Sequence, residues 1–230
     1  ITDECSLAGV VRAHVEAKEH GLHLIIGAEI NLLTAGGEPY AKLVLLATDR
    51  AAYGNLSELI TLARTRADKG SYRAYASDLE GKAAGHPHLQ HLPGCLALLI
   101  PAGDASFEQL FGQAMWLRTW FPERAWIAVE NLLRATDGPL IERIERVGHL
   151  TGVPLVAAGD VHMHLRSRKP VLDVAAAIRF GKTVAECGFA LASNAEQYLR
   201  PRVRLAQLYA PEWLDETLKI AARCQFSLNE

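Results

Sequence analysis

The chain has 230 residues, of which 50% are hydrophobic and 22% are charged, with 24 Lys and Arg against 26 Asp and Glu. This composition excludes a disordered chain, and a formal charge of −2 gives little electrostatic attraction for nucleic acid. No apolar run approaches the ~20 residues of a membrane helix. The four cysteines form no CxxC pair, so we expect a reduced, cytoplasmic protein with no membrane partner.

Segments with the apolar spacing of helices alternate along the chain with short apolar runs typical of buried strands. Residues 68–93 are polar and rich in Gly and Pro, which predicts a loose loop. In chain order, the predicted elements are a helix after Ser6, strands over Leu22–Leu33 and Leu43–Leu46, a helix after Asp49, a strand over Cys95–Ile100, a helix over Ser106–Trp120, a strand over Trp126–Val129, a helix from Pro139, a strand over Pro154–Ala158, and helices over Val171–Phe180, Pro201–Tyr209 and Pro211–Cys224.

Apolar strands that alternate with helices indicate an α/β protein with a mainly parallel sheet covered on both faces. The length favours a (β/α) barrel over a short open sheet. Ile1 and Thr2 are typical of the end of a strand. We therefore expect this chain to be an internal piece of a longer protein.

Carboxylates and a histidine follow several of the predicted strands. Asp3 follows the truncated first strand, Glu29 lies just past the apolar Leu24-Ile25-Ile26, and Glu130 ends another strand. Asp160 and His162 follow another strand, two residues apart, so in extended backbone they point the same way. Each acid could instead cap the next helix, but their recurrence at strand ends favours a site for divalent metal, Zn²⁺ or Mn²⁺.

Three other patterns are interpreted without a catalytic role. His86-Pro87-His88 has the spacing of a metal-binding pair, but the surrounding Gly and Pro favour an exposed loop. Gly181-Lys182-Thr183 lacks the first glycine of a phosphate-binding loop and follows a helix rather than a strand. The basic group around Arg168 is typical of a solvated loop, with a phosphate contact as the alternative.

Several motifs together resemble one family. Residues 1–10, Gly27-Ala28-Glu29, and the segments 93–97 and 156–164 are similar to PHP (polymerase and histidinol phosphatase) domains of the bacterial C-family DNA polymerase alpha subunit. Residues 45–50 and Ala128-Val129-Glu130 resemble the error-prone, translesion branch. The resemblance covers the whole chain.

The resemblance implies a distorted (β/α)7 barrel, similar to a TIM barrel, that lacks its first strand and HxH motif here. Residues 1–210 would form the barrel, and residues 211–230 the helical start of a link to the polymerase palm. Such domains hold a trinuclear metal centre, whose ligand positions fall on Asp3, Glu29, Cys95, Asp160 and His162. Lys42 and Arg134 stand where two further ligand histidines would align, which implies a degenerate centre with weak or partial metal binding.

The expected function is therefore that of a structural PHP fragment of an error-prone DNA polymerase. Its partners would be the rest of the polymerase chain, DNA through that longer protein, and other repair-polymerase subunits, and the parent polymerase would use Mg²⁺. The alternative is a free-standing metal-dependent phosphoesterase of the histidinol-phosphatase type. A non-enzymatic interaction domain is a third reading.

Overall fold

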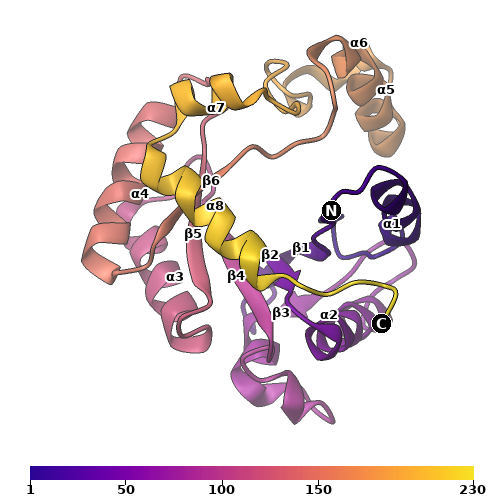
Figure 1. Cartoon of the computed structure of the whole chain (residues 1–230), viewed down its shortest axis with the longest axis vertical. Coiled ribbons are helices and arrows are strands. Elements are labelled where there is room, and N and C mark those ends of the chain that lie inside the picture. The colour runs from indigo at the N-terminus through magenta and orange to yellow at the C-terminus, as the bar shows by residue number, and fades with distance from the viewer.

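A six-stranded sheet forms the centre of the computed structural model, which describes all 230 residues. The strand order is β3-β1-β2-β4-β5-β6 (Figure 1). The strands are β1 (Gly27–Leu33), β2 (Pro39–Ala47), β3 (Ala74–Tyr75), β4 (Cys95–Ile100), β5 (Ala125–Glu130) and β6 (Leu155–Ala158). The expected strands are all present, and β4 has the predicted bounds.

One strand, β2, runs against all the others. It pairs antiparallel with both β1 and β4, whereas the pairs β1–β3, β4–β5 and β5–β6 are parallel. The connection from Leu33 to Pro39 is too short for the crossover that a parallel neighbour requires. The reversal brings the start of β2 to the edge of the sheet where the other strands end.

Three helices cover one face of the sheet: α2 (Arg50–Thr65), α3 (Phe107–Trp120) and α4 (Asp137–Thr151). Two of them begin at capping residues, and Asp49 is the cap expected from the sequence. The Asp49 carboxylate accepts a hydrogen bond from the Ala52 amide at 2.8 Å, and Ser106 forms a capping box with Gln109. The apolar faces of these helices and the alternate strand residues form the main core.

The opposite face of the sheet is covered by α8 (Pro211–Arg223), which crosses it diagonally in Figure 1. Ile220 and Cys224 pack there on a second apolar cluster from the strands. The Trp126 indole also donates a hydrogen bond to Glu216 at 2.7 Å. Beyond the helix, the Phe226 amide donates to the Thr48 carbonyl at 3.1 Å, so this segment is an integral part of the packed domain.

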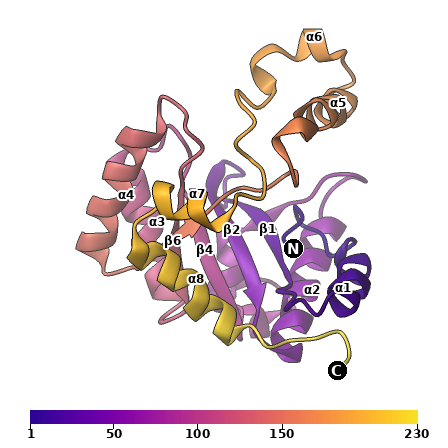
Figure 2. The same cartoon turned by 45° about the horizontal axis from the view of Figure 1, so that its top comes forward.

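Between β6 and α8 the chain leaves the sheet. Figure 2 shows α5 (Lys169–Phe180) and α6 (Val184–Cys187) standing off from the body of the molecule, before α7 (Arg202–Leu208) returns to it. An ion pair of 3.0 Å between Arg179 and Glu4 connects this excursion to the start of the chain. Thr183 caps α6 and Gly181 ends α5 with φ of +64°, which gives the Gly-Lys-Thr segment a local structural role.

Some local predictions were wrong. The first helix, α1 (Val10–Glu19), begins at Gly9 rather than at Ser6, and residues 22–26 precede the strand instead of belonging to it. Residues 68–93 contain β3 and the short helices η1 (Asp78–Lys82) and η2 (Pro87–Leu89), with Leu79, Leu89 and Leu92 fully buried. The remaining short helices are η3 (Arg166–Arg168) and η4 (Gly188–Ala190). None of the helices has the length and apolarity needed to cross a membrane.

Candidate functional site

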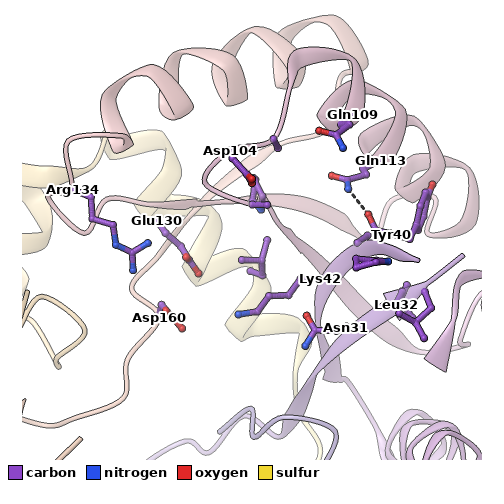
Figure 3. A pocket seen from close by; sticks show the side chains of 17 residues that line it. Asn31, Leu32, Tyr40, Lys42, Asp104, Gln109, Gln113, Glu130, Arg134 and Asp160 are labelled. Carbon is purple, nitrogen blue, oxygen red and sulfur yellow. Dashed lines mark hydrogen bonds between the residues drawn. The ribbon is translucent and has the colours of Figure 1, made fainter. Parts of the chain in front are cut away.

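A cavity of about 590 Å³ opens at the edge of the sheet where β4, β5 and β6 end. Its polar lining includes Lys42, Glu130, Arg134 and Asp160. Figure 3 shows these four side chains directed toward one another inside the cavity. We call this group, together with Glu29 and His162, the rim cluster. It lies at the strand ends where the sequence predicted a site.

Strand alternation places the rim residues and an apolar cluster on the same face of the sheet. Lys42 pairs with Ile100 and Asn31, Leu46 pairs with Leu96, and all of these residues point to the same face. The half of this face beneath α8 is apolar, whereas the half at the rim carries charged side chains. The rim cluster therefore lies beside an apolar cluster on the same face of the sheet.

Lys42 forms an ion pair with Glu29 across the β1–β2 hairpin. The distance from Lys42 Nζ to Glu29 Oε2 is 2.9 Å, and the two side chains are 32% and 21% exposed. Burial alone would lower the pKa of Lys42. The hydrogen bond to Glu29 and the negative charges of Glu29, Asp160 and Glu130 outweigh burial and raise it. Lys42 is thus a fixed cation among three carboxylates.

Glu130 has the most perturbed carboxyl group of the rim. Burial, followed by the charge of Asp160, raises its pKa to about 7, although Lys42 and Arg134 oppose the shift. Near neutral pH this group is thus divided between its acid and carboxylate forms. Such a group can take up or release a proton at physiological pH.

Asp160 and His162 are brought together as predicted, at 3.0 Å between Asp160 Oδ1 and His162 Nε2. Burial opposes ionisation of Asp160, but the hydrogen bond and charge of His162 lower its pKa below the usual value. The same hydrogen bond raises the pKa of His162. Asp160 adopts a φ of +42°, a conformation that a non-glycine residue rarely holds unless its surroundings impose it.

The surroundings of Asp160 come from a segment to which the sequence assigned no role. Gln197 donates a hydrogen bond to Asp160 Oδ2 at 2.5 Å. The Tyr209 hydroxyl donates to the Ala158 carbonyl at 2.6 Å, and the buried Arg200 donates to that hydroxyl and to the Asn131 carbonyl. These residues hold the ends of β5 and β6 in place, yet no motif or periodicity marks them.

Asp3 and Cys95 are not brought to the rim. Asp3 lies against Gly9, and Glu4 is the residue that pairs in register with Glu29. Cys95 starts β4 and pairs with Ala47, five residues from the Ile100 position that faces Lys42. At about 3.3 Å per residue that is roughly 16 Å. Burial raises the pKa of the Cys95 thiol to about 12, and the thiol donates a hydrogen bond to the Ala52 carbonyl at 3.4 Å within the core.

The rim cluster does not fit a trinuclear metal centre. Glu29 is already neutralised by Lys42, and Asp160 and His162 are hydrogen-bonded to each other. A fixed ammonium group among the donors repels a divalent cation and supplies part of the charge that such a cation would provide. Of the five expected ligands, Glu29, Asp160 and His162 direct their side chains to the rim, whereas Asp3 contacts Glu29 only through its backbone carbonyl, 3.1 Å from the Glu29 amide.

A second group of metal-type donors lies elsewhere, on α2 and η2. His86 Nδ1 and His88 Nε2 lie 2.6 and 2.9 Å from the two carboxylate oxygens of Glu58. The Gly and Pro around this His-Pro-His segment predict an exposed loop, and nothing in the spacing identifies Glu58 as its partner. The three residues offer ligand atoms within 4.8 Å of one another, a donor set that fits a divalent metal.

Comparison with known proteins agrees with this architecture. The PHP domain family matches residues 1–142. Error-prone DNA polymerases of Bordetella parapertussis and Dechloromonas aromatica are each 50% identical to the chain over 230 residues, and that of Methylococcus capsulatus is 47% identical over 230 residues. Each match covers 100% of this chain but only 20–22% of the relative. The chain therefore spans about a fifth of the length of these relatives.

Proposed function

Because the chain belongs to the PHP domain family, we propose that it is the PHP region of an error-prone DNA polymerase. Other parts of such a polymerase would carry out DNA-templated synthesis across lesions with Mg²⁺, and DNA and other repair subunits would be partners of that longer protein. Identity of 50% across the full chain to error-prone polymerases supports this assignment. The same family membership supports the finer proposal of a distorted (β/α)7 barrel.

We propose that the domain has a structural role and a degenerate metal centre. The observation that carries this proposal is the 2.9 Å ion pair of Lys42 with Glu29, beside Glu130 and Asp160. The Lys42 ammonium group balances the negative charge of the nearby carboxylates, so that no bound metal is needed to hold them together. The ion pair also counts against the alternative of a free-standing phosphoesterase, which needs metal-bound water to attack phosphate.

Residual metal binding at the rim would be weak. Glu29, Asp160 and His162 would hold at most one or two ions, Zn²⁺ or Mn²⁺, after displacing the existing hydrogen bonds. The segment 211–230 would lead toward the polymerase palm. Its packing on the sheet supports an added role in covering the apolar face of this domain.

A hydrolysis assay tests the structural role. The chain is incubated with Mn²⁺ or Zn²⁺ and with p-nitrophenyl phosphate or single-stranded DNA, beside the variant Asp160→Asn. We expect both proteins to release product at the same background rate. Metal-dependent hydrolysis that Asp160→Asn abolishes would overturn the proposal and favour the phosphoesterase.

A further inference from the structure

The carboxylate of Glu58 is held by two imidazoles from a different part of the chain. It lies on α2, while His86 and His88 flank Pro87 at the start of η2. The donor distances are 2.6 Å to His86 Nδ1 and 2.9 Å to His88 Nε2. Nothing in the rim cluster or in the proposed polymerase role requires this arrangement.

The backbone around the two histidines is fixed. Pro87 restricts the rotation between them, and the adjacent Leu89 and Leu92 are fully buried in the main core. On the other side, α2 is anchored in the same core through residues that include Leu56 and Leu59. The three donors are thus presented by two elements whose positions are set by packing, which reduces the entropic cost of assembling a site.

The donor atoms have a spacing that a small shift converts into a metal site. Two ligands of a tetrahedral zinc ion with bonds of about 2.0–2.1 Å lie about 3.3 Å apart. The separations of 2.6 and 2.9 Å between Glu58 and the two imidazoles are shorter than this, and all three ligand atoms lie within 4.8 Å of one another, so small side-chain movements bring them to zinc-binding distances. The side chains are 31%, 50% and 38% exposed for His86, His88 and Glu58, which leaves access for the ion and for a water ligand.

We propose that Glu58, His86 and His88 form a zinc site that fastens the segment between β3 and β4 to α2. Two imidazoles and one carboxylate match the preference of Zn²⁺, and a water molecule completes four ligands. The bound ion replaces the two hydrogen bonds to Glu58 with three coordinate bonds. Binding to the folded state alone stabilises the domain.

Calorimetric titration with ZnCl₂ tests the site. To separate it from the rim, the titration is repeated in Asp160→Asn/His162→Ala, where we expect the tighter equivalent of Zn²⁺ to bind as in the unmodified chain and any weak binding at the rim to be lost. In His86→Ala/His88→Ala we expect affinity to fall by about 100-fold or more, since loss of even an outer-shell partner costs 10–100-fold. The matched control is His20→Ala, which removes a histidine 3.9 Å from Glu16 on the surface of α1 and leaves binding unchanged.

Nuclear magnetic resonance of ¹⁵N-histidine in the unmodified chain gives a reading that does not depend on any variant folding. Zn²⁺ should shift the imidazole nitrogens of His86 and His88 at one equivalent and leave those of His20 in place. Zinc affinity that survives replacement of both loop histidines, or saturation without a shift at His86 and His88, overturns the proposal.

Discussion

Lys42 and Glu29 reach the rim from within β2 and β1, while Glu130 ends β5 and Asp160 follows the end of β6. It pairs with Glu29 and lies within electrostatic reach of Glu130 and Asp160. Three neighbouring carboxylates without a cation would repel one another. A single lysine thus accounts for much of the charge balance in this part of the molecule.

Replacing Lys42 with Met should destabilise the domain in chelating buffer. Lys42 and Glu29 are partly exposed, so the free energy of unfolding should fall by about 2 kcal/mol, a value between those for surface and buried ion pairs. That corresponds to a fall in Tm of roughly 4–8 °C for a chain of this size. The control is Lys42→Met with Glu29→Gln, which removes both charges and should recover most of the loss. Equal melting of the unmodified chain and Lys42→Met would refute the charge-balance account.

Glu130 should make stability fall as the pH rises. Its pKa in the folded state is about 7, against an ordinary value of 4.5. Between these values the folded protein binds a proton that the unfolded chain has released, so the free energy of unfolding decreases from about pH 4.5 through pH 7. Glu130→Gln removes this contribution, which is at most on the order of 3 kcal/mol.

Urea denaturation at pH 5 and pH 8 measures this contribution. The loss of stability between the two values should be smaller in Glu130→Gln than in the unmodified chain. Glu142→Gln, at an exposed position of α4, serves as the control and should follow the unmodified chain. Identical losses in Glu130→Gln and the unmodified chain would show that Glu130 ionises normally.

At the scale of elements, α8 is the helix that covers the apolar half of the sheet face on which the rim cluster lies. It covers Leu98, Trp126 and Val156, whereas the rim cluster beyond it stays open to the cavity. The helix is amphipathic, with Ile220 5% exposed and Leu218 69% exposed. Its apolar side packs on the half of the sheet face that lies next to the charged site.

Ile220→Ala should lower the free energy of unfolding by about 2–4 kcal/mol, since it removes buried methyl groups and leaves a cavity. Leu218→Ala, two residues away on the same helix, should change it by less than about 0.5 kcal/mol. Urea denaturation of both variants measures the difference. Similar small effects in the two would mean that α8 does not pack on the sheet as described.

Most of the regular elements could be predicted from the sequence, and the reasons are local. The run Cys95–Ile100 is apolar throughout and buried throughout, so its bounds are recovered. Asp49 and Ser106 predict their helices because capping depends on nearest neighbours. The buried leucines of residues 68–93 follow no regular period, which is why that segment was misread as a loose loop.

The candidate site was only partly predictable, because its pairs join distant parts of the chain. Asp160 and His162 are two residues apart and were predicted together. Glu58 is 28 residues from His86, and Gln197 is 37 residues from Asp160, so neither contact follows from spacing. Cys95 was placed at the rim by resemblance, whereas strand direction puts it at the opposite end.

At the scale of the whole molecule, charge predicts weak binding to DNA. The chain has a formal charge of −2, and the rim cluster contains as many carboxylates as basic groups. We expect the chain alone to bind duplex or single-stranded DNA with a Kd no tighter than about 10⁻⁶ to 10⁻⁴ M at physiological salt. Fluorescence anisotropy with a labelled oligonucleotide measures this value. Nanomolar binding would contradict the prediction.

The late position of α8 in the chain has a consequence for synthesis on the ribosome. Leu98, Trp126 and Val156 are made long before the helix and the Phe226 segment that cover their face of the sheet. About 70 residues separate Val156 from Phe226, which at 5–20 residues per second is roughly 4–14 s of translation. During that interval the nascent chain exposes an apolar sheet face, so this is the stage at which a chaperone would protect it from aggregation.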